Sequence, residues 1–318
     1  MTVRVLYIAG SGRSGSTLLA RLLDQVDGLF APGELRYVWQ RGLIEDRFCS
    51  CGQRFGACPF WTKTLDQAFG GRDGVDPHAM SRAQRSTTRA RHLPRALLST
   101  RHPAGARHLG GYAAAVSALY RSIQDVSGAE VVVDSSKLPT YGHLLTSIPG
   151  IEVAVVHLVR DPRAAAHSWL RPKAQPDRGG NGIMQQQGAA KSAVLWDTWN
   201  AAALRLFANH HPRLLLRYED LVDDPRHAVA RVLDLIGHGA GPAGFADDRT
   251  VTLRSGHSVA GNPDRLSSGP THIRLDDEWM TALDARRRTL VTALTAPLLR
   301  RFDYPLRVGR ASGRRSSA

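Results

Sequence analysis

Lysine is scarce in this chain, although the chain is strongly basic. Of its 42 Lys and Arg residues, four are lysines and 38 are arginines. Cysteine is also rare: the three cysteines cannot all pair with one another, and they cluster at positions 49, 51 and 58, unlike the framework of a small secreted disulfide protein. No apolar run reaches the roughly 18 residues that span a bilayer, because the longest, residues 153–159, has the length of a strand.

The chain begins without a charged and apolar leader, because residues 1–4 (MTVR) continue directly into a strand-like segment. We therefore expect a cytoplasmic protein. The 318 residues, 42% of them hydrophobic, are enough to bury a full core, which excludes a disordered tail or a small stapled scaffold. The net charge of +14 fits either a solvated basic surface or an anionic partner such as a nucleotide, a nucleic acid or an acidic membrane.

Strand patterns alternate with helix patterns along most of the chain. Strands are predicted over residues 3–9, 130–133, 152–159 and 214–217, and helices over residues 16–25, 112–126, 163–170, 189–209, 227–236 and 276–301. This alternation predicts an α/β fold, with a mainly parallel sheet covered by helices on both faces. We expect one domain over residues 1–306, followed by a basic, disordered tail over residues 307–318.

A glycine-rich loop, Gly10-Ser11-Gly12-Arg13-Ser14-Gly15-Ser16-Thr17, lies between the first strand and the first helix. Backbone amides at such a helix N-terminus bind anions. Ser16 stands where a phosphate-binding loop has lysine, which argues against an ordinary kinase or ATPase. The loop also fits the dinucleotide pattern, with Glu34 near the expected acid, although residues 27–32 (DGLFAP) make a poor strand. The loop predicts a phosphate site and leaves its ligand open.

A second anion-binding pair lies in residues 153–169 (VAVVHLVRDPRAAAHSW). Arg160 ends a buried strand, and Ser168 follows it by eight residues, on the next helix. The alternative is that Arg160 pairs with Asp161 or Glu219 and that Ser168 has no special role. Taken with the first loop, the arginine and serine indicate a nucleotide with phosphates at both ends.

Four segments, in the same order along the chain, resemble motifs of the sulfotransferases that use 3′-phosphoadenosine 5′-phosphosulfate (PAPS). Residues 12–18 (GRSGSTL) resemble their 5′-phosphosulfate loop, and residues 158–168 (LVRDPRAAAHS) resemble their 3′-phosphate motif. Two later blocks of bacterial members resemble residues 217–225 (RYEDLVDDP) and 257–265 (HSVAGNPDR). The resemblance implies a P-loop-like α/β fold with helical and loop insertions that cover the substrate, and PAPS as the sulfuryl donor.

The resemblance also implies which residues bind the nucleotide. The 5′ phosphosulfate is expected to contact amides and hydroxyls of the first loop, at Gly12, Arg13, Ser14, Gly15, Ser16 and Thr17. The 3′ phosphate is expected to contact Arg160 and Ser168. The later glycine-rich block is expected to close over the nucleotide with Asn262 and Arg265.

Sulfuryl transfer requires in-line positioning, cations near the bridging oxygen of the leaving group, and a base for the acceptor hydroxyl. Arg13 and Lys137 are the predicted cations. Lys137 follows a strand that ends at Asp134, and the alternative is a surface lysine paired with that acid. Asp134 also imitates the metal-binding acid of P-loop enzymes, but the missing loop lysine argues against that role.

Glu34 is the predicted general base. The segment Gly33-Glu34-Leu35-Arg36 resembles the catalytic-glutamate segment of tyrosylprotein sulfotransferases. Many cytosolic members instead have histidine two residues after the lysine, where this chain has Pro139. His143 and His167 are the other candidates and are expected to be structural.

This chemistry requires no metal, and none is expected. The cysteine segments Cys49-x-Cys51-Gly52 and Cys58-Pro59-Phe60-Trp61 resemble a region of related bacterial enzymes. Three thiols suit a zinc ion with a fourth ligand, or one disulfide, and local packing is favoured over both.

The sequence therefore predicts a PAPS-dependent sulfotransferase acting on a hydroxyl of a small molecule, a glycolipid or a carbohydrate. The acceptor is expected between Glu34, residues 77–111 and residues 171–187, with Trp196 and Trp199 in the core. One alternative is a P-loop nucleotide kinase or hydrolase. The other is an arginine-rich nucleic-acid-binding protein, which would bind arbitrary DNA or RNA in a salt-sensitive manner.

Overall fold

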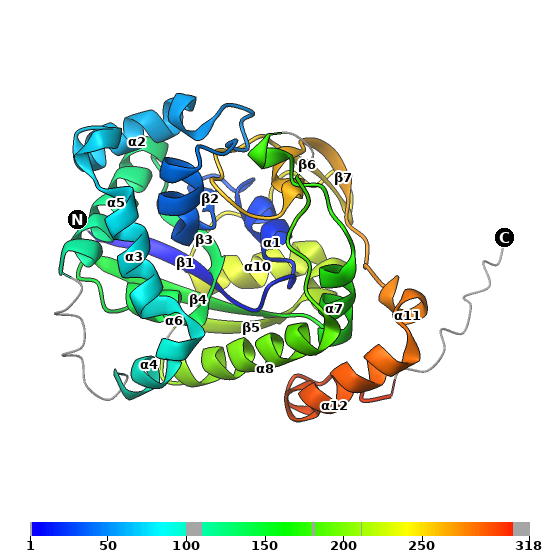
Figure 1. Ribbon diagram of the computed structural model, residues 1–318. Helices are drawn as coiled ribbons and strands as arrows, with labels where there is room; N and C mark the ends of the chain where they lie inside the picture. The colour runs from blue at the N-terminus through cyan, green and yellow to red at the C-terminus, as the bar shows by residue number, and fades with distance from the viewer. Residues whose placement is uncertain (1, 100–109, 180–181, 211, 308–318) are drawn as a thin grey trace.

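The computed structural model describes residues 2–99, 110–179, 182–210 and 212–307. Its centre is a five-stranded sheet in the order β2-β3-β1-β4-β5, in which every neighbouring pair of strands is parallel (Figure 1). The strands are β1 (Val3–Gly10), β2 (Leu29–Gly33), β3 (Val131–Lys137), β4 (Ile151–Val159) and β5 (Arg213–Arg217). The predicted α/β class with a parallel sheet is confirmed.

Helices cover both faces of the sheet, because β1 carries apolar side chains on both sides. Val5 and Tyr7 pack on one face, with α2 (Pro59–Phe69), α5 (Gly110–Ser127), α6 (Pro139–Leu145) and the end of α8 (Ala189–Leu206). Leu6 and Ile8 pack on the other face, with α1 (Ser16–Leu23), α9 (Tyr218–Asp223) and α10 (Pro225–Leu235). Both halves of the core are thus fixed by the alternation of side chains along the strands.

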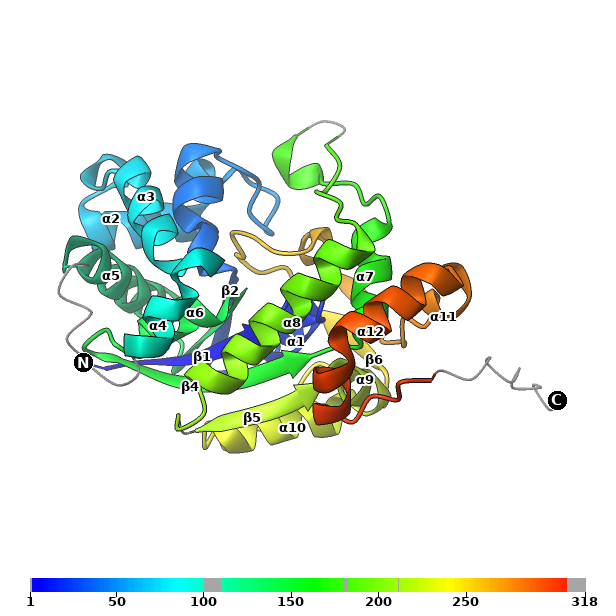
Figure 2. The same ribbon diagram turned by 60° about the horizontal axis from the view of Figure 1, so that its bottom comes forward.

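A third layer flanks the β4–β5 side. Here α12 (Ala285–Arg301) packs along α8 and against α7 (Pro162–Leu170), as Figure 2 shows. The remaining helices are α3 (Pro77–Thr88), α4 (Leu93–Ser99) and α11 (Trp279–Ala282). Among the described residues, no helix has the length and apolarity needed to cross a bilayer.

The order of the strands separates the two interpretations of the first loop. The dinucleotide fold places the strand that follows the first helix directly beside β1. Here β3 lies between β1 and β2, so the strand order is not that of the dinucleotide fold. The sequence interpretation of residues 27–32 was wrong, because Leu29–Gly33 does form a strand, at the edge of the sheet. Burial of Leu29 and Ala31 in the core outweighs the weak local propensity of this segment.

One pair of strands was not predicted, and one predicted helix is divided. Residues 254–272 show no strand periodicity, yet Gly269–His272 (β7) pairs antiparallel with Thr250–Leu253 (β6). The helix predicted over residues 276–301 is divided into α11 and α12, because the Asp284 carboxylate accepts a hydrogen bond from the Arg287 N–H and so begins a new helix. Nearly all of the expected tail, residues 308–318, lies outside the described residues.

Candidate active site

A cavity of about 1090 Å³ lies where the first four strands end. Residues at or just after the carboxyl ends of β1, β2, β3 and β4 line it: Gly10, Glu34, Lys137 and Arg160. In open α/β sheets, ligands bind at this edge. Loop residues between positions 171 and 187 also line the cavity, and their contact with the acceptor stays a prediction.

The first loop turns so closely between β1 and α1 that two positions accept only glycine. A Cβ at Gly10 would lie 2.3 Å from the Leu158 carbonyl oxygen. A Cβ at Gly15, where φ is +91°, would lie 2.4 Å from the Tyr218 ring. The helix α1 begins directly after the loop, so its unpaired N–H groups lie at the cavity wall. This is the structure of an anion-binding loop.

Side chains of the loop differ in their placement. Gly12, Arg13, Gly15, Ser16 and Thr17 line the cavity. Ser14 does not: its hydroxyl is buried, without a hydrogen-bond partner among the described residues.

The Arg13 guanidinium lies over the Trp169 ring at 4.6 Å, and its buried Nε atom has no partner among the described residues. Burial lowers the pKa of Arg13, but an arginine keeps its charge at neutral pH.

Glu34 and Lys137 meet in this cavity, although 103 residues separate them in the chain. The Lys137 Nζ atom lies 2.6 Å from Glu34 Oε1, and both side chains are mostly buried. Burial of the Glu34 carboxyl opposes its ionisation, but the positive charges of Lys137, Arg41 and Arg36 outweigh burial and hold its pKa below the usual value. Glu34 is therefore ionised at neutral pH. The alternative partner for Lys137, Asp134, is not the one that it contacts.

Asp134 instead holds the segment around Glu34. Its fully buried carboxylate accepts hydrogen bonds from the Leu35 N–H at 3.4 Å and from the Tyr120 hydroxyl at 2.5 Å. The neighbouring Ser136 hydroxyl accepts one from the Arg36 N–H at 3.0 Å. The end of β3 thus fixes the backbone that directly follows Glu34.

Arg160 is 6% exposed and touches both halves of the predicted nucleotide site. Its guanidinium lies over the Tyr218 ring at 4.3 Å and 3.1 Å from the Asp276 carboxylate. It also donates to the Arg13 carbonyl oxygen at 3.3 Å. The strand-end arginine and the first loop, 147 residues apart, therefore line one site.

The alternative partners of Arg160 are engaged elsewhere. Asp161 begins α7 and forms an ion pair with Arg163 at 2.6 Å. Glu219 accepts a hydrogen bond from the Asp161 N–H at 3.1 Å. Ser168 lines the same cavity as Arg160.

Residues 257–262, here named the strap, cross the site beside Glu34. The Glu34 N–H donates to the Ala260 carbonyl oxygen at 3.1 Å, and the Asn262 N–H donates to Thr17 Oγ1 at 3.2 Å. Asn262 lines the cavity, but Arg265 does not. The buried Arg265 guanidinium is held by Asp177, at 3.2 Å, and by two backbone carbonyl oxygens. The structure therefore brings together every predicted site residue except Ser14 and Arg265 around the cavity.

Several other residues lie elsewhere than the sequence predicted. Neither His143 nor His167 lines the cavity, and none of the described residues in the ranges 77–99 and 110–111 does. Trp196 is buried, as expected, and donates to the Arg160 carbonyl oxygen at 2.9 Å, but both Trp196 and Trp199 line the cavity. The sequence analysis missed Trp169, Tyr218, Asp276, Tyr37, Arg36 and Arg41, which line the cavity too. Only the aromatic and basic composition of their segments would have pointed to them.

Comparison with known proteins identifies the family of this chain. A family model described as "Sulfotransferase family" matches residues 6–239, which include the first loop, Glu34, Lys137 and the Arg160 motif. The chain belongs to the sulfotransferase family. Family membership implies PAPS as the sulfuryl donor. A search of curated protein sequences found no match.

Solved structures of sulfotransferases resemble this fold. The sulfotransferase domain from the curacin biosynthetic pathway aligns with a TM-score of 0.52 at 18% identity, over 96% of this chain and 99% of that domain. The sulfotransferase STF9 from Mycobacterium avium aligns with a TM-score of 0.45 at 14% identity, over 96% of this chain and 78% of that one. A sulfotransferase from Alicyclobacillus acidocaldarius aligns with a TM-score of 0.41 at 12% identity, over 94% and 96% of the two chains.

Proposed function

We propose that this sulfotransferase moves the sulfuryl group of PAPS to a hydroxyl of a small-molecule, glycolipid or carbohydrate acceptor, with Glu34 as the general base. The main support is the Glu34–Lys137 contact of 2.6 Å in a cavity that the first loop and Arg160 also line. A base, a cation and two anion-binding elements thus share one space, which is the set that in-line sulfuryl transfer requires.

The cavity wall fits a nucleotide with phosphates at both ends. The Nε atoms of Arg13 and Arg160 are buried without partners among the described residues, and such donors are costly unless an acceptor reaches them. Amides of the first loop and α1 would hold the 5′ phosphosulfate, and Arg160 with Ser168 would hold the 3′ phosphate. PAPS supplies an activated sulfuryl group with a nucleoside phosphate as the leaving group. Arg265, committed to Asp177, would support the loop around the site and not touch the nucleotide.

The Glu34–Lys137 ion pair would link deprotonation of the acceptor hydroxyl to stabilisation of the leaving oxygen. Glu34 is ionised before transfer and accepts the proton of the acceptor hydroxyl as that oxygen attacks. Once Glu34 is protonated, Lys137 loses its counter-charge. The full charge of Lys137 then becomes available to the leaving oxygen, beside Arg13.

The acceptor would enter from the side of Tyr37. The guanidinium groups of Arg36 and Arg41 lie over this ring at 4.0 Å and 3.8 Å, and all three residues line the cavity. Residues 171–187 form the facing wall and include Ile183. An aromatic ring with flanking cations fits an acceptor that has both an apolar and a polar part.

Calorimetric titration with adenosine 3′,5′-bisphosphate, the expected product, tests the proposal against ATP, AMP and NAD. Arg160→Ala removes charge-assisted hydrogen bonds of roughly 1.5–3 kcal/mol, so bisphosphate affinity should fall about 10- to 150-fold. AMP lacks the 3′ phosphate, and its affinity should change little. Equal or tighter binding of ATP or NAD by the unaltered protein would overturn the proposal.

A further inference from the structure

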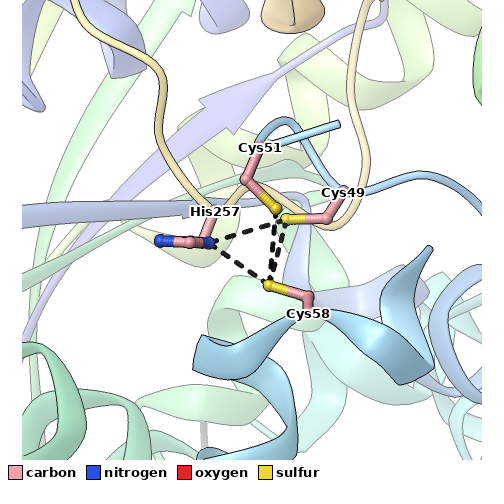
Figure 3. Close-up of side chains that lie close together, drawn as sticks. All are labelled: Cys49, Cys51, Cys58 and His257. Atoms are coloured by element: carbon pink, nitrogen blue, oxygen red, sulfur yellow. Dashed lines mark hydrogen bonds between the residues drawn. The ribbon is translucent and has the colours of Figure 1, made fainter. Parts of the chain in front are cut away.

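Four potential metal ligands face one another outside the cavity: Cys49, Cys51, Cys58 and His257 (Figure 3). Their three sulfur atoms and the His257 Nδ1 atom all lie within 4.8 Å of one another. Cys49 and Cys58 are fully buried, and the other two residues are partly buried. In the part of the chain that the structure describes, this is the one such group. The mechanism above uses none of these residues.

Four of the six distances between the ligand atoms are close to those of a tetrahedron around zinc. With Zn–S bonds of about 2.3 Å and a Zn–N bond of about 2.0 Å, two ligand sulfurs lie about 3.8 Å apart and a sulfur and a nitrogen about 3.5 Å apart. The sulfur of Cys58 lies 3.6 Å from that of Cys51 and 3.7 Å from that of Cys49. The Nδ1 atom of His257 lies 3.2 Å from the Cys58 sulfur and 4.0 Å from the Cys49 sulfur.

The same distances do not describe a disulfide. A disulfide brings two sulfurs to about 2.05 Å and would leave the third thiol unpaired beside it. Here Cys58 is nearly equidistant from the other two sulfurs, and a histidine nitrogen completes the group. Three thiols and one imidazole are a common ligand set of structural zinc sites.

The neighbouring residues hold the ligands in these positions. The His257 ring stacks on Phe60 at 5.2 Å, and the His257 carbonyl oxygen accepts the Trp61 indole N–H at 3.0 Å. The Gly52 N–H donates to the Cys49 carbonyl oxygen at 3.0 Å, which closes a turn and brings the sulfurs of Cys49 and Cys51 to one side. The stacking fixes the plane of the His257 ring, and the carbonyl contact fixes its backbone.

We propose that Cys49, Cys51, Cys58 and His257 bind one zinc ion in a closed, tetrahedral, structural site. On binding, the thiols release their protons to solvent and the ion takes three thiolates and the neutral imidazole, with no change of oxidation state. This replaces the expectation that the protein holds no metal. The site has no open position, so the ion takes no part in sulfuryl transfer.

The zinc would cross-link two segments that are distant in the sequence. Residues 49–58 supply the three thiols, and the strap begins with His257. The strap accepts the Glu34 N–H through Ala260 and contacts Thr17 through Asn262. The ion would therefore fix the strap against the active site while remaining outside it.

Metal analysis of the full-length protein, purified under reducing conditions, tests the proposal. We expect about one zinc ion per chain and, after exchange with Co²⁺, visible absorption bands of a tetrahedral cobalt–thiolate site. Titration with an organomercurial should release the zinc as three thiols react. Cys58→Ser and His257→Gln should each lose most of the metal.

Ser50→Ala is the matched control. The Ser50 hydroxyl accepts the Ser258 N–H at 2.7 Å, so this variant disturbs the same contact between the two segments but leaves every ligand in place. It should retain its zinc. Absence of zinc from the unaltered, reduced protein after incubation with excess Zn²⁺ would overturn the proposal, even if the ligand variants failed to fold. So would a disulfide between two of these cysteines in the freshly purified protein, detected by mass spectrometry.

Discussion

Glu34→Gln removes the proposed proton acceptor and preserves the shape of the site. The amide oxygen of glutamine can still accept a hydrogen bond from Lys137 Nζ, which lies 2.6 Å from Glu34 Oε1. A positioned general base contributes about 10²- to 10⁴-fold to the rate. We therefore expect kcat to fall by this factor, which corresponds to about 2.7–5.5 kcal/mol of transition-state stabilisation.

Nucleotide binding should respond differently from the rate. The carboxylate of Glu34 is negative and shares the cavity with the anion-binding loop, so its neutralisation removes a repulsion. Affinity for adenosine 3′,5′-bisphosphate should therefore stay the same or increase. Single-turnover transfer from radiolabelled PAPS, with an acceptor found by screening hydroxyl compounds, gives the rate, and calorimetry gives the affinity.

Two further variants make this test specific. Glu130→Gln changes an acid whose side chain is 67% exposed, and it should leave both quantities unchanged. Glu34→Asp keeps the charge on a shorter side chain and should have an intermediate rate. A loss below about tenfold in Glu34→Gln, or an equal loss of nucleotide affinity, would refute the assignment of Glu34 as the base.

The remaining predictions concern the charges and the shape of the site. Lys137→Met should move the acid limb of the kcat/KM profile to higher pH. Burial raises the pKa of Glu34, and the charge of Lys137 is the strongest influence that lowers it. Without that charge, less of Glu34 is ionised at a given low pH. The exposed Lys63→Met is the control, and an unmoved limb would contradict the coupling. Gly15→Ala places a Cβ 2.4 Å from the Tyr218 ring, on which the guanidinium of Arg160, the proposed 3′-phosphate ligand, stacks. It should weaken binding of adenosine 3′,5′-bisphosphate more than that of AMP. Equal weakening of both would show that the first loop does not affect Arg160.

Local signals predicted the parts of the site that depend on a few neighbouring residues. The glycines of residues 10–15 and the start of a helix at Ser16 predict an anion-binding loop, because such a loop exposes backbone amides at a helix N-terminus. A hydrophobic strand directly before Arg160 places that arginine at the edge of a parallel sheet. Glu34 was predicted as the base only through the resemblance of residues 33–36 to a family segment, because its own surroundings looked irregular.

Local signals failed where distant contacts decide the structure. Residues 27–32 have weak strand propensity, but Leu29–Gly33 pairs with β3 and buries Leu29 and Ala31, so this segment forms the edge strand. Arg265 lies in a block that resembles a nucleotide-binding segment, yet the buried carboxylate of Asp177 engages it. Asp177 lies 88 residues away in the chain, and no periodicity of the sequence predicts such a pair.

The sequence by itself determined the fold class and the family, and it gave the order of the elements proposed to bind phosphate. Each of these depends on short patterns of neighbouring residues. The tertiary structure alone decided which side chains meet. The contacts of Lys137 with Glu34 and of His257 with Cys58 join residues 103 and 199 positions apart. Such contacts depend on the strand order and on the path of the strap, and both are set by the burial of the whole core.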